Sequence, residues 1–81
     1  MTRNQRKILE ISRYLWQHYR WPLPELYIDY SPRGEAILCV VDNDGGMYPI
    51  DIYEDRAEAQ EEKRALEAWL RDTWSDISSK D

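Results

Sequence analysis

The stretch EAILCVVD, residues Glu35–Asp42, is the one unbroken apolar run of the chain that is also rich in strand-forming residues. A strand without alternation of apolar and polar side chains is typical of one that is covered on both faces. The stretches Leu26–Tyr30 (LYIDY) and Met47–Tyr53 (MYPIDIY) do alternate, as strands with one buried and one wet face do. The middle of the chain is therefore predicted to be a three-stranded meander with Glu35–Asp42 at its centre.

Short turn sequences connect the predicted strands. Proline suits the second position of the turn Ser31–Gly34 because its ring fixes φ, and Asn43–Gly46 supplies residues that tolerate positive φ. Such short links make neighbouring strands antiparallel. Pro49 cannot donate a hydrogen bond to a sheet ladder, so the last strand is predicted to lie at an edge of the sheet.

An amphipathic helix is predicted on each side of the strands. From Arg3 to Arg20 the apolar residues recur at helical spacing, and the prolines that follow Trp21 end this helix. Its predicted buried stripe is Ile8, Ile11, Leu15 and Tyr19. The second helix is predicted to begin at Asp55, whose carboxylate can cap the first turn. Its predicted buried stripe is Ala59, Leu66, Trp69, Leu70, Thr73 and Ile77.

The predicted fold is a single α+β domain over residues 1–81, with residues 78–81 as a frayed tail. Its order is α-β-β-β-α, a three-stranded antiparallel meander packed against two amphipathic helices. The sequence allows two arrangements, with both helices on one face of the sheet or with one helix on each face. The central strand indicates some cover on both faces, either from the Trp21–Leu26 segment or from a partner. Without that cover, the side chains that face solvent would be Tyr27, Asp29, Met47, Asp51 and Tyr53.

The chain is acidic, with 16 acidic and 11 basic side chains in 81 residues and a formal net charge of -5. Polyanions repel such a chain, which argues against general binding to nucleic acid or to a membrane surface. No window is apolar enough for a membrane helix and no secretory signal is seen, so a cytoplasmic location is predicted. The one cysteine, Cys39, agrees with a reducing compartment.

No catalytic motif and no metal site is predicted. Asp29 and Asp51 are the carboxylates of the sheet, but the central strand separates them by about 10 Å. His18 has no cysteine or serine placed to work with it, and Cys39 in an apolar strand has poor access. The protein is therefore predicted not to be an enzyme and to need no cofactor.

The α-β-β-β-α order is shared with double-stranded RNA-binding domains, which this chain resembles in topology alone. Those domains carry a lysine-rich stretch at the start of the second helix, where it grips phosphates. In this chain the same place is taken by Glu54–Ala59 (EDRAEA). Its acidic character argues against binding of double-stranded RNA.

A basic face on the first helix is the one feature that favours nucleic acid. Residues 1–20 hold five basic side chains and one acidic side chain. Arginines on the side opposite the apolar stripe would contact phosphates. These are Arg3, Arg6, Arg13 and Arg20. A solvated surface, or a complement to the acidic second helix, is the competing interpretation.

The aromatic composition favours protein binding. The chain has four Trp, six Tyr and no Phe. Tyr and Trp combine a large apolar area with a polar group, and they are common at the centre of protein interfaces. Periodicity places several of them at helix flanks or on the wet sheet face, and these are the predicted contacts. They are Tyr14, Trp16, Tyr27, Tyr53 and Trp74.

We therefore predict a small acidic, non-enzymatic protein-binding module of the adaptor or inhibitor type, or a homodimer. Glu58, Glu61 and Glu62 of the second helix would present carboxylates to a basic partner that handles nucleic acid. In charge and size alone, the chain resembles small acidic proteins of phages and mobile elements that block host defence nucleases. Nucleic-acid binding through the first helix is the alternative function.

Overall fold

A computed structural model of the chain describes residues 1–79. Its elements are α1 (Arg3–Tyr19), β1 (Glu25–Tyr30), β2 (Ala36–Val41), β3 (Met47–Tyr53) and α2 (Arg56–Ser79). The strands form one antiparallel sheet in the order β1-β2-β3, so β2 is central and β3, which contains Pro49, lies at an edge. The predicted α+β class, element order and meander are confirmed. Residues 80–81, the end of the tail predicted to fray, lie outside the described residues.

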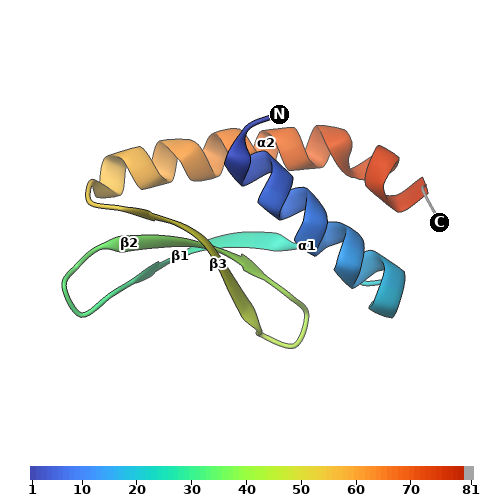
Figure 1. Cartoon of the computed structure of the whole chain (residues 1–81), viewed down its shortest axis with the longest axis horizontal. Coiled ribbons are helices and arrows are strands. Elements are labelled where there is room, and N and C mark those ends of the chain that lie inside the picture. The colour runs from blue at the N-terminus through green and yellow to red at the C-terminus, as the bar shows by residue number, and fades with distance from the viewer. Residues whose placement is uncertain (80–81) are drawn as a thin grey trace.

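Both helices lie on the same side of the sheet, and the other side carries no helix (Figure 1). The core between the two layers joins strand residues to Ile8 of α1 and to Leu66 and Leu70 of α2. The strand residues of this core are Leu26, Ile28, Ala36, Leu38, Val40 and Ile50. Full burial of a large aliphatic side chain contributes roughly 1.5–3 kcal/mol, so this layer of contacts holds the helices on the sheet.

The two hairpins close through three-residue loops of the same kind. The amide of Gly34 donates to the carbonyl of Ser31 at 2.9 Å, and the amide of Gly45 donates to the carbonyl of Asp42 at 3.2 Å. Both glycines have positive φ, +85° and +83°, the left-handed conformation that such a loop requires of its third residue. The turn sequences therefore fix the register of the meander.

Both ends of α1 are capped. The Thr2 hydroxyl accepts from the Gln5 amide at 3.1 Å, and the Gln5 side chain accepts from the Thr2 amide at 2.9 Å. At the other end Arg20 adopts the left-handed conformation, with φ +56° and ψ +32°, and its amide donates to the carbonyl of Trp16 at 3.0 Å. This turn brings Trp21 back onto the last turn of the helix.

The buried face of α1 differs in part from the predicted one. Its buried residues are Asn4, Ile8, Ser12 and Leu15. Ile11 is half-buried, and Tyr19, which was predicted to be buried, is 52% exposed. The reason is that the Tyr19 ring packs on Tyr14 and Trp21 instead of on the core. In α2 the predicted stripe is confirmed, with Ala59, Leu66, Leu70 and Ile77 buried and with Trp69 and Thr73 half-buried.

A β-bulge in β3 decides which of its side chains face the helices. The register shifts between Leu38 and Cys39, and Ile50 is the extra residue opposite them. One extra residue moves the following side chains to the other face of the sheet. Asp51 and Tyr53 consequently face α1, and the prediction that they face solvent is wrong.

Asn4 of α1 ties the end of β3 to the helix. Its Nδ2 donates to Asp51 Oδ2 at 2.9 Å and to the Tyr53 hydroxyl at 3.1 Å. Burial, followed by the charge of Asp51, raises the pKa of Tyr53 to about 12. Burial also acts to raise the pKa of Asp51, but hydrogen bonds from Asn4, the Ile52 amide and Tyr53 outweigh it and lower that pKa. The ionised carboxylate of Asp51 is therefore part of the folded structure.

Replacement of Ser12 by alanine is expected to stabilise the protein. Ser12 is fully buried in α1, and its hydroxyl finds no hydrogen-bond partner within residues 1–79. An unpaired buried polar group costs about 1–3 kcal/mol, and alanine is the better helix former. Ser12→Ala should raise the free energy of unfolding, measured by urea titration, by about 1 kcal/mol. At the exposed position Gln17, the control Gln17→Ala should change it by less than about 0.5 kcal/mol. A loss of stability in Ser12→Ala would contradict the prediction.

Acid is expected to weaken the fold through Asp51. Because its pKa is lowered in the folded state, the carboxylate stabilises the protein above about pH 4, and this contribution is lost as the pH falls through the folded pKa. The difference in free energy of unfolding between the unmodified chain and Asp51→Asn should therefore shrink between about pH 6 and pH 3. Asp72→Asn, at an exposed position of α2, is the control. A difference for Asp51→Asn that stays constant over this range would rule out the role given to the carboxylate.

Candidate protein-binding surfaces

The face of the sheet without a helix is the main candidate surface and is called the open sheet face below. Across its middle, the strand register places Tyr27 of β1, Cys39 of β2 and Pro49 of β3 side by side. The whole face consists of Glu25, Tyr27, Asp29, Ile37, Cys39, Val41, Met47, Pro49 and Ile52. Apart from the two acids at its β1 side, every position is apolar or aromatic.

Large side chains of the open sheet face are exposed. Ile52 is 58% exposed, Tyr27 51% and Met47 41%. The sequence predicts cover on both faces of the central strand, but the helices cover one face alone (Figure 1). The Trp21–Leu26 segment does not supply the other cover, because its residue Leu23 packs on the core at the side of the helices. That suggestion is wrong, and within residues 1–79 the chain itself leaves this face uncovered.

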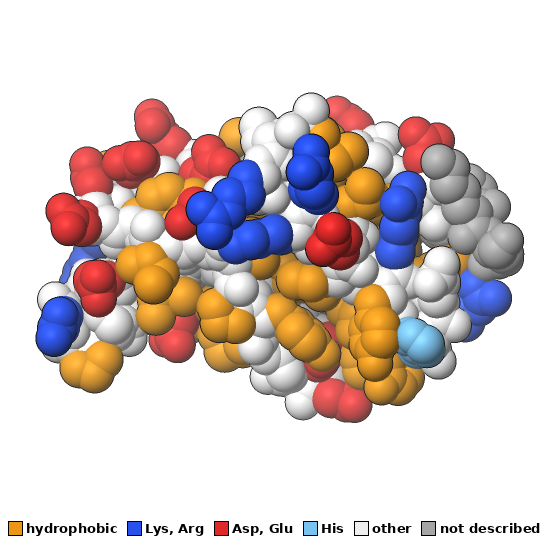
Figure 2. All heavy atoms as spheres, viewed as in Figure 1, with side chains coloured by type: hydrophobic (Ala, Val, Ile, Leu, Met, Phe, Trp, Pro, Cys, Tyr) orange, Lys and Arg blue, Asp and Glu red, His pale blue; other side chains and the backbone are white. Residues whose placement is uncertain are grey.

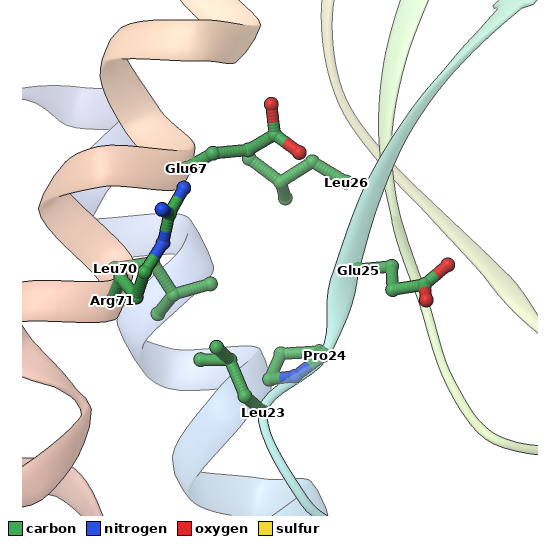
Figure 3. Close-up of a pocket in the computed structure, with 7 residues that line it drawn as sticks. All are labelled: Leu23, Pro24, Glu25, Leu26, Glu67, Leu70 and Arg71. Carbon is green, nitrogen blue, oxygen red and sulfur yellow. The ribbon is translucent and has the colours of Figure 1, made fainter.

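A hollow between β1 and α2 marks the place where this segment meets the helix layer (Figure 3). Its volume is about 250 Å³, and its walls include Leu23 and Leu26 on one side and Leu70 and Arg71 on the other. The carboxylate of Glu25 points away from it. Small-molecule sites usually have volumes of roughly 300–1,000 Å³, and this hollow lies just below that range.

Cys39 lies at the centre of the open sheet face but is only 2% exposed. Its Sγ is 3.6 Å from the carbonyl oxygen of Ile37, and Tyr27 and Pro49 flank it across the sheet. Burial, followed by the charge of Asp29, raises the pKa of the thiol. A protonated and inaccessible thiol is a poor nucleophile, so Cys39 acts here as a small apolar side chain.

Rings at the end of α1 form a second surface, called the aromatic patch below, which consists of Tyr14, His18, Tyr19 and Trp21. The rings of Tyr14 and His18 are 4.2 Å apart, and those of Tyr19 and Trp21 stack at 4.3 Å with 16° between their planes. The rings of Tyr14 and Tyr19 meet edge to face at 6.3 Å. Figure 2 shows His18, in pale blue, beside apolar side chains of this surface. The patch is preformed by contacts among its own members.

The β2–β3 turn places acidic groups close to the aromatic patch. Asp42 Oδ1 accepts from two amides of its own turn at 2.8 and 2.9 Å, and Asp42 Oδ2 accepts from the Tyr48 hydroxyl at 3.0 Å. Burial acts to raise the pKa of Asp42, but these hydrogen bonds outweigh it and lower the pKa. Interaction with Tyr14, then burial, then the charges of Asp44 and Asp42 raise the pKa of Tyr19. Both carboxylates therefore lie within electrostatic reach of the patch.

The aromatic residues predicted as contacts do not form one cluster. Tyr27 lies on the open sheet face, and Tyr14 belongs to the aromatic patch. Trp16 and Trp74 are half-buried and pack edge to face at 5.9 Å, which joins α1 to α2. Tyr53 is half-buried beneath α1 instead of on the wet face.

Sequence reasoning missed three members of the aromatic patch: His18, Tyr19 and Trp21. Tyr19 falls at the helical spacing of buried residues, so periodicity assigns it to the core. Trp21 comes close to it only through the left-handed turn at Arg20, a conformation that a non-glycine residue adopts rarely. The sequence therefore carries no direct signal that these two rings stack.

The predicted charged residues lie on the helix layer. Glu58 and Glu61 of α2 are exposed and Glu62 is half-buried. Exposed arginines are Arg3, Arg6 and Arg13 of α1 and its C-cap Arg20. Figure 2 shows Lys and Arg side chains along the front of the molecule. The guanidinium of Arg20 lies over the Trp16 ring, 5.2 Å from its centre.

The acids of the sheet do not converge. Asp29 and Asp51 lie on opposite faces of it, because the bulge turns Asp51 toward α1. Within residues 1–79 no three side chains of His, Cys, Asp or Glu are grouped as metal ligands. In the same part of the chain, neither helix has the length and apolar character needed to cross a membrane.

Comparisons with known proteins do not place the chain in a family. No family model, no curated protein and no solved structure matches it. The function must therefore be argued from the surfaces of the molecule.

Tyr27 is expected to shield Cys39 from solvent. At about pH 8 the folded protein should react with Ellman's reagent much more slowly than the unfolded chain, because the thiol is buried and its pKa is raised. Tyr27→Ala should raise the rate about tenfold or more by opening access to the sulfur. Tyr30→Ala, at an exposed tyrosine on the other face of the same strand, should not. Equal rates for Tyr27→Ala and the unmodified chain would disprove the shielding.

Proposed function

We propose that this protein is a protein-binding module and that its partner covers the open sheet face. One observation carries the proposal. The apolar composition of β2 is that of a strand covered on both faces, but helices cover it on one face alone. Ile52, Tyr27 and Met47 are the exposed apolar side chains that binding would bury. Contiguous exposed apolar surface of this kind marks interaction sites in soluble proteins.

The dimensions of the face fit a single helix of a partner. Three strands about 4.8 Å apart, with six or seven residues each at about 3.4 Å, give a face of roughly 14 by 20 Å. An α-helix is about 10–12 Å in diameter, and about 13 residues span 20 Å. A partner helix of this length would extend the two layers to a helix–sheet–helix sandwich, a common stable architecture.

The charges on the face favour a basic partner. Glu25 and Asp29 lie at its β1 side, and none of its positions is Lys or Arg. A second copy of the chain would bring these carboxylates into an interface without basic residues of the face to match them, which is unfavourable. The proposed occupant is therefore an amphipathic helix of another protein, whose apolar stripe is flanked by Lys or Arg.

A protein that binds its partner without catalysing a reaction would act as an adaptor or an inhibitor. Its net charge of -5 attracts a basic partner before contact, over a distance of about 8 Å at physiological salt. Glu58 and Glu61, exposed on α2, add to this attraction from the helix layer. Proteins that handle nucleic acid carry the positive surface that such a field attracts.

Nucleic-acid binding through α1 is the second candidate function. Arg3, Arg6 and Arg13 are exposed on this helix, and arginines so placed can contact successive phosphates. The arginines belong to the helix layer, whereas the open sheet face is on the other side of the sheet. Variants can therefore separate the two functions.

Site-specific crosslinking tests the proposal. The photoreactive residue p-benzoylphenylalanine replaces Ile52 of the open sheet face, Glu61 of α2 or Arg13 of α1 in the full chain, expressed in its native cells. We expect position 52 to crosslink to one protein and position 61 to crosslink to none. In calorimetry the purified partner should bind Ile52→Asp at least about tenfold more weakly, because burial of isoleucine contributes roughly 1.5–3 kcal/mol. Gln60→Ala, at an exposed and uncharged position of α2, is the control and should leave the affinity unchanged.

Two results would overturn the proposal. Crosslinks found only at position 13, and lost on nuclease treatment, would move the function to nucleic acid at α1. A crosslink from position 52 to a second copy of the chain, together with a dimer in sedimentation, would make the open sheet face a self-interface.

A further inference from the structure

The aromatic patch is explained neither by the core nor by the open sheet face. Tyr14 is 48% exposed and Tyr19 52% exposed, and neither belongs to the core cluster. Tyr and Trp side chains that are held rigidly at a surface are typical of binding hot spots. The patch is therefore a candidate site in its own right, independent of the proposed function.

The backbone at Arg20 is what builds the patch. Its left-handed conformation costs about 1–2 kcal/mol in a residue with a side chain. In return, Trp21 stacks on Tyr19 with nearly parallel rings. The same turn places the guanidinium of Arg20 over the Trp16 ring. Arg20 lies between Tyr19 and Trp21 in the sequence, but its side chain contacts Trp16.

Acidic groups accompany these rings. Asp42 is held ionised by the amides of its own turn and by the Tyr48 hydroxyl, and Asp44 beside it is exposed. The β2–β3 turn that carries both carboxylates lies at the same end of the molecule as the C-terminal end of α1 (Figure 1), and their charges act on Tyr19. Figure 2 shows acidic side chains below the apolar side chains that adjoin His18. The face of an aromatic ring is itself electronegative, so rings and carboxylates attract the same kind of ligand, a cation.

We propose that the aromatic patch, together with Asp42 and Asp44, binds an arginine side chain of a partner peptide. A guanidinium is planar, stacks on aromatic rings and forms paired hydrogen bonds with a carboxylate. The inner faces of the Tyr19 and Trp21 rings lie against each other, so the guanidinium would stack on an outer face of this pair. Asp44 supplies an exposed carboxylate. A lysine ammonium lacks the planar shape that would use both parts of the site.

Nucleic acid does not fit the same site. Bases also stack on exposed aromatic side chains, but single-stranded nucleic acid is held by a positively charged groove along its phosphates. Asp42 and Asp44 would instead repel phosphates that approach the patch. The charges beside the rings therefore distinguish an arginine-bearing peptide from an oligonucleotide.

Peptide titrations followed by NMR test the inference on the full chain. The probe is a seven-residue peptide in which arginine alternates with glycine, and the matched peptides carry citrulline or lysine in place of arginine. We expect the arginine peptide to shift the amide signals of residues 14–21 and 42–46. The citrulline peptide, which has the same shape without the charge, should produce no shifts in these segments.

Variants identify the contributing groups. Tyr19→Leu and Asp44→Asn should each weaken binding of the arginine peptide about threefold, the size expected for one exposed cation–ring or ion-pair contact. Tyr27→Leu on the open sheet face and Asp72→Asn on α2 are the matched controls and should leave it unchanged. Each of these variants changes an exposed side chain. Circular dichroism establishes that each variant is folded.

Several results would overturn the inference. One is binding of the citrulline peptide or the lysine peptide as tight as that of the arginine peptide. Another is a loss of affinity for the arginine peptide in Tyr27→Leu as large as that in Tyr19→Leu. Shifts confined to the open sheet face or to α2 would also do so. The crosslinking partner of position 52 plays no part in these measurements, so failure here leaves the proposed function standing.

Discussion

The burial of β2 under helices on one face only is the constraint on which the rest of the structure depends. Leu38 and Val40 are completely buried and join all the elements in one core. Because both helices attach to this same face, no helix covers Ile37, Cys39 and Val41, which β2 points the other way, and neighbouring strand residues such as Tyr27 give them their cover. A domain of this size buries only about 60% of the surface that its unfolded chain exposes, so it has little chain to spare for a second cover.

The bulge at Ile50 gives β3 two roles. Ile50 points into the core by alternation with Tyr48, and the bulge then brings Asp51 to the same side, within hydrogen-bond distance of Asn4. The carbonyl of Ile50 also accepts from Lys7 Nζ at 2.9 Å, which places a basic side chain on the outer edge of the strand. Pro49, the bulge and this lysine together protect an edge strand from pairing with another chain.

The sequence was sufficient for the order of the elements and of the strands in the sheet, because turn chemistry and periodicity are local. Gly34 and Gly45 sit where their loops need positive φ, and Pro49 lies in the edge strand where its missing donor costs nothing. The side chains of the candidate surfaces were less predictable. An alternating stretch such as MYPIDIY does not reveal a bulge, so periodicity places Asp51 and Tyr53 on the wrong face.

The choice of helix face was equally beyond the sequence. Amphipathic periodicity says that a helix has a buried side, but it does not say on which face of a sheet that side packs. The non-alternating pattern of β2 does indicate cover on both faces. It points to a binding surface only in combination with the structure, in which one face carries no helix. The aromatic patch depends on one backbone conformation at Arg20, which pattern reasoning does not reach.

The order of the strands in the sheet is the same as their order in the chain. Each hairpin therefore closes over a short loop and loses little chain entropy before its first cross-strand contacts form. Packing of α1 against α2 instead joins the two ends of the chain, and Trp16 and Trp74 meet only when that long loop has closed. Since folding speed follows the share of contacts that are local, we expect the sheet to form early and the helix layer to close over it as the slower, final step.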